Sequence, residues 1–180
     1  ACDPRPARMR APARAGSGRL LGGCDNLADV LWRTRDECGR RHARLVAAVR
    51  DGCAGPVADV LAEPGRDGTV RAVLDRGDGL RTGLSRLGYG ELRYLALALV
   101  LLTGPGVLAV DPAGEVPPAL QTLTVLADGF DRGLDPRQRR ALLDLAAAMC
   151  ARGHIRLVGA VADGSWAAGA AGVTVVHLEP

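Results

Sequence analysis

The chain has 180 residues, of which 48% are hydrophobic and 24% charged, a balance typical of a globular domain with a sizeable core. Its net charge of +3 is too small to indicate nucleic-acid binding, and its longest apolar run, residues 94–102, is too short to span a bilayer. The five scattered cysteines form no C-x-x-C pair, and the three histidines lack zinc-ligand spacing. We therefore expect a cytoplasmic protein with reduced thiols and no membrane association.

The N-terminal third divides into two segments. Residues 1–22 are rich in Arg, Ala, Pro and Gly, and this composition predicts a disordered tail. The alternative is an arm that binds nucleic acid through its arginines. Residues 23–56 have helical spacing of apolar positions, with Asn26 as the expected N-cap. We expect an interruption at Gly39 and an end at Gly52.

A hairpin and a glycine-rich helix start follow. Residues 57–63 and 69–75 flank a Pro-Gly-Arg-Asp-Gly turn, which predicts an antiparallel hairpin. Gly88-Tyr89-Gly90-Glu91 then opens a buried helix that runs to about Leu102, with Glu91 in its first turn. Unpaired backbone N–H groups and the helix dipole point outward at such a start, which can therefore hold an anion.

Two apolar segments in the C-terminal half each end in an aspartate. Residues 107–110 lead to Asp111, and residues 123–127 lead to Asp128. Both are predicted to be strands. An aspartate at the carboxyl end of a strand in a parallel sheet lies where α/β proteins place their ligands.

The remaining residues continue the alternation of helix and strand. Leu134-Asp135 precedes a helix in which Asp135 is the expected N-cap and Gln138 completes a capping box. Residues 155–161 and 173–178 are predicted to be the last strands. The alternation predicts an α/β fold with a largely parallel sheet covered by helices.

The order of these motifs resembles the second half of an ATP-binding-cassette-type P-loop ATPase of the soluble, RecF/SMC-like and AAA-type branch. Leu87-Gly88-Tyr89-Gly90-Glu91 stands at the signature loop, Leu123–Asp128 at the Walker B strand, and Leu134-Asp135 at the D-loop. The resemblance covers about residues 57–178 and implies a domain, 57–180, that forms the C-terminal lobe of such an ATPase, without the Walker A region.

The resemblance also implies cofactors and site residues. ATP and Mg²⁺ would be bound between two chains, so a homodimer or a partner lobe that carries the P-loop is expected, and the analogy extends to nucleic acid. Asp128 would be the metal ligand and catalytic acid beside the phosphates. Gly88, Gly90, Glu91 and Asp135 would lie against the nucleotide.

Several residues depart from the family pattern. The chain contains no Lys, so the P-loop lysine is absent and ATP hydrolysis would require a Walker A lobe. Gly88 replaces the signature serine, Gly129 stands where the catalytic glutamate should be, and Val161 lies near the position of the switch histidine. Asp111 lies at the family's usual spacing after the signature and is the alternative to Asp128. A non-catalytic module for dimerisation or partner docking is the alternative function.

Overall fold

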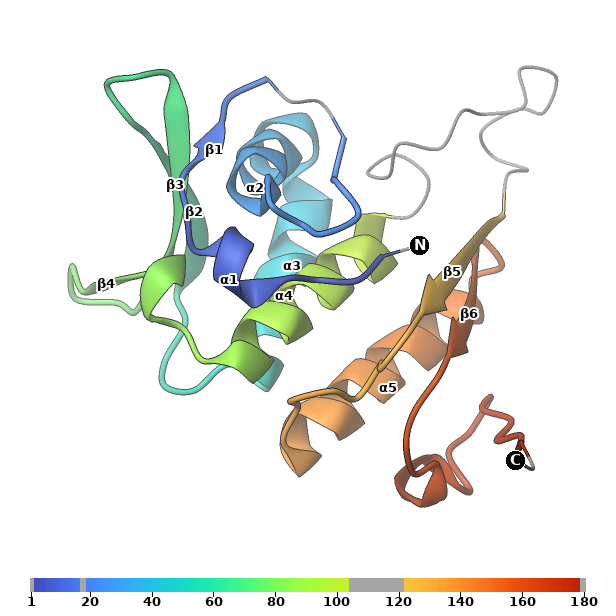
Figure 1. The fold of residues 1–180 in the computed structure, drawn as a ribbon. Coiled ribbons are helices and arrows are strands. Elements are labelled where there is room, and N and C mark those ends of the chain that lie inside the picture. Colours follow the sequence, from blue (N-terminus) through green and yellow to red (C-terminus); the bar gives the residue numbers. More distant parts are fainter. Residues whose placement is uncertain (1, 17–18, 104–121, 179–180) are drawn as a thin grey trace, which may run out of the picture.

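The computed structural model describes residues 2–16, 19–103 and 122–178, and Figure 1 shows how their elements are arranged. The helices of this part are α1 Pro6–Met9, α2 Leu27–Glu37, α3 Gly39–Gly52, α4 Tyr89–Thr103 and α5 Pro136–Cys150, with 3-10 turns at Leu84–Arg86 and Ser165–Ala167. The strands are β1 Ala13–Arg14, β2 Asp59–Pro64, β3 Thr69–Asp75, β4 Arg81–Gly83, β5 Leu123–Ala127 and β6 Ile155–Gly159.

The larger sheet is antiparallel and has four strands in the order β1-β3-β2, with β4 also paired to β3. The predicted hairpin is confirmed, because β2 and β3 pair with Val60 opposite Leu74 and Ala62 opposite Ala72. Val60 and Leu74 are buried, and α2 lies against both strands. The hairpin thus buries one face under a helix, as its alternation of side chains predicts.

The smaller sheet is parallel and consists of β5 and β6, paired from Leu123 opposite Ile155 to Ala127 opposite Gly159. The mixed α/β class is confirmed, but the expectation of a largely parallel sheet is wrong for the described residues. The segment predicted as a last strand, 173–178, forms no strand. Its residues Val176 and Leu178 are exposed. The predicted strand 107–110 lies outside the described residues.

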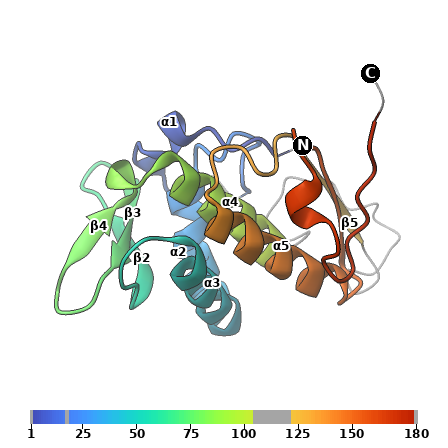
Figure 2. The ribbon, with the colours of Figure 1, turned by 90° about the horizontal axis from the view of Figure 1, so that it is seen from below.

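Helix α4 is the centre of the core. Every residue from Leu92 to Leu101 is buried, so this helix is apolar on all sides instead of having one polar face. It contacts α1, α3 and α5. Figure 2 shows α4 beside α5, with the small parallel sheet beyond them.

The N-terminal residues are packed against this core, and the prediction of a disordered tail over 1–22 is wrong for the described part of that segment. Cys2, Met9, Ala13 and Leu20 are buried, and Ala13 in β1 pairs with Val70 in β3. The apolar side chains are spaced between arginines that remain at the surface. Composition alone suggested disorder, whereas long-range pairing orders the segment.

The helical segment is interrupted as predicted, because Cys38 is extended (φ −155°, ψ 94°) between α2 and α3. Asn26 occupies the predicted N-cap position of α2, but its side chain forms no capping hydrogen bond there. Its amide instead accepts a hydrogen bond from the Leu21 N–H (2.9 Å) and donates one to the Arg19 carbonyl (2.7 Å). Asn26 therefore holds the preceding loop.

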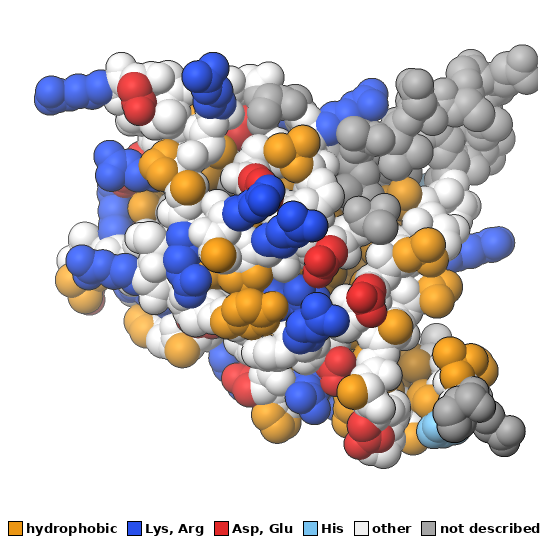
Figure 3. Space-filling model, viewed as in Figure 1, with side chains coloured by type: hydrophobic (Ala, Val, Ile, Leu, Met, Phe, Trp, Pro, Cys, Tyr) orange, Lys and Arg blue, Asp and Glu red, His pale blue; other side chains and the backbone are white. Residues whose placement is uncertain are grey.

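On the face in Figure 3, arginine side chains are spread over the molecule, with acidic side chains between several of them. None of the helices in the described part of the chain combines the length and hydrophobicity needed to cross a lipid bilayer.

Candidate functional site

The start of α4 and the loop between β5 and α5 lie against each other. A Cβ atom on Gly90 would collide with the backbone carbonyl oxygen of Gly133 and lie 2.7 Å from Oε1 of Gln138. Gly133 itself has a positive φ of 70°, which favours glycine. The signature-like turn and the D-loop-like turn are therefore adjacent, and Gly90 is required for their close approach.

Glu91 stabilises the start of α4 because both of its carboxylate oxygens accept hydrogen bonds. One accepts a hydrogen bond from the backbone N–H of Gly88 (2.8 Å), and the other accepts one from the N–H of Ala54 (2.9 Å), just after α3. This carboxylate satisfies one N–H group at the start of its own helix and one beyond the end of a neighbouring helix. The Gly88 N–H is consequently engaged within the chain.

Asp135 caps α5, and the predicted capping box is confirmed. Its Oδ1 accepts from the Gln138 N–H (2.7 Å), while the Gln138 side chain accepts from the Asp135 N–H (3.1 Å). Gln138 is buried and also donates to the Gly52 carbonyl (2.7 Å) at the end of α3. Gln138 therefore links the start of α5 to the end of α3 in addition to completing the capping box.

Asp128 differs from these two carboxylates because its side chain accepts no hydrogen bond from the described residues. Its side chain follows the carboxyl end of β5, is 82% exposed, and forms one long ion pair with Arg132 at 3.9 Å. No group of three or more His, Cys, Asp or Glu residues in the described ranges could hold a metal ion. A single carboxylate nevertheless suits Mg²⁺ when phosphate oxygens and water complete the octahedron. Asp128 therefore fits Mg²⁺ together with a phosphate ligand, but not Mg²⁺ alone.

Arg93 binds the backbone of the loop that carries Asp128, a role that the sequence analysis missed. The side chain is 1% exposed and donates to the carbonyls of Gly129 (2.9 Å), Asp128 (3.5 Å) and Pro4 (3.0 Å). Asp3 lies 3.4 Å away as its ion-pair partner. The available signal was an arginine within the apolar stretch of the helix, one turn into α4, because a buried guanidinium must find partners.

Cys53 lies next to the Glu91 carboxylate, one residue before Ala54, and the raised pKa of its thiol makes it a poor nucleophile. Burial, followed by the negative charge of Glu91, raises the pKa of the Cys53 thiol to about 12. The thiolate is the reactive form, so Cys53 is inert near neutral pH.

The structure therefore brings together four of the predicted site residues, Gly88, Gly90, Glu91 and Asp135, and Arg93 connects them to the backbone of Asp128. Asp111, the alternative Walker B acid, lies outside the described residues. No family model matches the chain, and no match was found among curated proteins or solved structures.

Proposed function

We propose that this chain is the C-terminal lobe of a soluble cassette-type P-loop ATPase and that it takes part in binding Mg-ATP at an interface with a second chain or lobe. One observation carries the proposal: two stretches that are distant in sequence, the start of α4 and the loop between β5 and α5, meet at one end of the molecule. Residues 88–91, 128–129 and 133–135 are joined by the close approach of Gly90 to Gly133 and by the hydrogen bonds of Arg93.

The environment of Asp128 supports its role as the Mg²⁺ ligand. The carboxylate is exposed at the carboxyl end of a parallel strand, and only Arg132 competes for it among the described residues. Ligands in α/β sheets bind at this end of the strands. Gly129 supplies no general base beside it, so we propose nucleotide binding with slow or no hydrolysis by this lobe alone.

An exposed apolar face of the parallel sheet supports the proposal that a second lobe binds this chain. Leu126 and Val158 are paired across β5 and β6 on the face away from α5, and they are 55% and 60% exposed. Parallel sheets are normally covered on both faces, and an exposed apolar pair on such a sheet is a candidate contact surface. A P-loop lobe bound here would supply the lysine that this chain lacks.

A second candidate function, a non-catalytic module for dimerisation or docking, is favoured by a different observation. Both oxygens of Glu91 accept hydrogen bonds from backbone N–H groups, and Asp135 is engaged in a capping box. Carboxylates engaged in this way stabilise helix ends and need no ligand to explain them.

The test is a thermal-shift and sedimentation series on the full-length gene product with Mg-ATP. We expect Mg-ATP to raise the Tm and to favour the dimer, and Asp128→Asn to remove most of both effects. Asp144→Asn, the same change at another exposed aspartate, on α5, is the matched control. An unchanged response in Asp128→Asn would refute the site assignment. No nucleotide effect on the wild-type protein would favour the non-catalytic module.

A further inference from the structure

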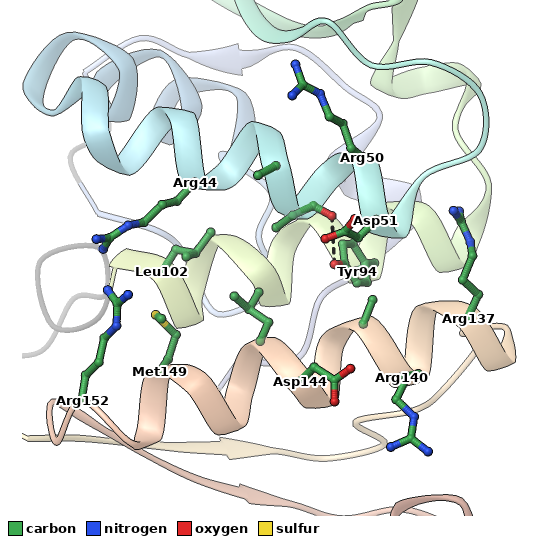
Figure 4. A pocket seen from close by; sticks show the side chains of 14 residues that line it. Arg44, Arg50, Asp51, Tyr94, Leu102, Arg137, Arg140, Asp144, Met149 and Arg152 are labelled. Carbon is green, nitrogen blue, oxygen red and sulfur yellow. Dashed lines mark hydrogen bonds between the residues drawn. The ribbon is translucent and has the colours of Figure 1, made fainter. Parts of the chain in front are cut away.

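A groove with a volume of about 640 Å³ lies on a different part of the molecule from the Asp128 carboxylate. Helices α3 and α5 form its two walls, and α4 lies between them at the bottom (Figure 4). The volume is in the range of pockets that bind ligands or side chains of a partner. Its residues are not explained by the proposed nucleotide site.

The floor and both walls of the groove carry small and flexible apolar side chains. Leu102 and Leu145 are half-buried, Met149 is buried at the edge, and Ala47 is exposed. Alanines on the walls allow the backbone of another helix to approach closely, and Met adapts its shape to different side chains. A partner with an apolar stripe would complete the packing of this surface.

The rim of the groove is positively charged. Five arginines line it against two acids, Asp51 and Asp144. Arg50 and Arg137 are held by backbone carbonyls of Val57 and Cys53.

Two of the remaining arginines gather at one end of the groove. Figure 4 shows Arg44 on α3 and Arg152 just after α5 beside Leu102 and Met149. Within the described residues, neither guanidinium forms a hydrogen bond or an ion pair with another side chain. This end of the groove therefore offers two cations to an acidic group.

We propose that the groove binds an amphipathic, acidic helix of a partner protein. The apolar stripe of that helix would lie on Leu102, Leu145 and Met149, and its carboxylates would face Arg44 and Arg152. Such recognition uses side chains spaced at i, i+3, i+4 and i+7 on one helix face. Helix α5 has 15 residues and is therefore about 22 Å long, which accommodates a partner helix of roughly four turns.

The floor of the groove favours a peptide over single-stranded nucleic acid. Proteins bind single strands by stacking bases on exposed aromatic rings beside a basic groove. The aromatic residue that lines this groove, Tyr94, is 1% exposed, and its hydroxyl donates to the Ala48 carbonyl (2.9 Å). No ring is presented for stacking in the described part of the groove.

The test uses two fluorescein-labelled model helices with the same leucine stripe, one with Glu and one with Lys at its polar positions. We expect the Glu peptide to bind saturably, at least about tenfold more tightly than the Lys peptide, and to lose about tenfold in affinity with Arg44→Glu/Arg152→Glu. Arg71→Glu/Arg156→Glu is the control, since it changes the net charge equally at exposed sites elsewhere. Its affinity for the Glu peptide should remain within about twofold of wild type.

Circular dichroism and melting curves would show that both double variants are folded. The proposal is overturned if the Glu peptide does not bind, if both peptides bind equally, or if Arg44→Glu/Arg152→Glu leaves the affinity unchanged. It is also overturned if a labelled single strand of thymidines binds more tightly than the Glu peptide and loses that binding in the same variant. None of these outcomes depends on nucleotide binding at Asp128.

Discussion

Replacement of Arg93 by Met tests whether the buried guanidinium holds the N-terminal segment and the Asp128 loop together. The change removes the donor for two short hydrogen bonds, to the carbonyls of Gly129 and Pro4. Hydrogen bonds from a charged donor contribute about 1.5–3 kcal/mol each, and the apolar Met recovers part of this by avoiding the burial of a charge. We expect a net loss of about 3 kcal/mol in the free energy of unfolding, or roughly 6–12 °C in Tm.

Urea unfolding followed by circular dichroism measures the loss, and an unchanged m-value would show that the denatured state is unaffected. Trypsin provides a local measurement at Arg8, in the short helix α1. Because Arg93 binds the Pro4 carbonyl, we expect cleavage after Arg8 to be faster in the variant at protease concentrations that leave the wild type intact. Arg93→Lys should give an intermediate loss, since an ammonium cannot reproduce the planar array of donors.

The matched control is Arg71→Met on the exposed side of β3, for which we expect a change within about 0.5 kcal/mol. The reasoning is refuted if Arg93→Met costs less than about 1 kcal/mol or if trypsin cleaves both proteins at the same rate. Either result would mean that the N-terminal segment is held by its apolar contacts alone.

Three further predictions address the helix ends. Gly90→Ala should lower the free energy of unfolding by about 1–3 kcal/mol, because the added Cβ meets the Gly133 backbone. Gly39→Ala, with open space around it, is the control and should be neutral or slightly stabilising. Urea titration measures both. Asp135→Ala should cost about 1 kcal/mol through loss of the cap, and a change below about 0.3 kcal/mol would contradict the role of the capping box. Cys53, with its pKa raised to about 12, should resist iodoacetamide at pH 8 in the folded protein and react in urea. Above about pH 9 the thiol ionises in the unfolded chain but stays neutral in the folded one. Its contribution to stability should therefore be complete below about pH 9 and decline as the pH rises toward 12, which urea titrations across that range would measure.

The elements that the sequence predicted well are those determined by neighbouring residues. The hairpin of β2 and β3 is encoded by a glycine turn and alternating side chains, and α5 begins at the predicted cap. Strand β5 has the predicted bounds, Leu123–Ala127. Each of these signals acts over a few residues, so it can be read without knowledge of the rest of the fold.

The features that the sequence did not reveal depend on distant partners. Residues 1–22 have the composition of a disordered tail, but β1 pairs with β3 and Arg93 binds Pro4, contacts that no local pattern records. Residues 173–178 have the composition of a strand but form none. In this segment apolarity indicated neither burial nor strand pairing, since Val176 and Leu178 are exposed.

The position of Glu91 in its helix was predicted, but the second hydrogen-bond partner of its carboxylate was not. Glu91 lies at a helix start, as the sequence indicated, but its second partner is the N–H of Ala54, 37 residues earlier in the chain. In the sequence, a carboxylate that caps a helix cannot be distinguished from one that is available to bind a ligand. Only the hydrogen bonds of the folded chain distinguish Glu91 from the exposed Asp128.

The burial of residues 92–101 of α4 determines which backbone amides of the described structure exchange with solvent most slowly. Helices α1, α3 and α5 contact this helix, so its backbone is shielded from solvent on several sides at once. Hydrogen exchange in such a segment requires the whole structure to open, whereas strand and helix ends exchange through local fraying. We expect the amides of residues 95–101 to exchange at the rate of global unfolding and to report the stability of the entire molecule.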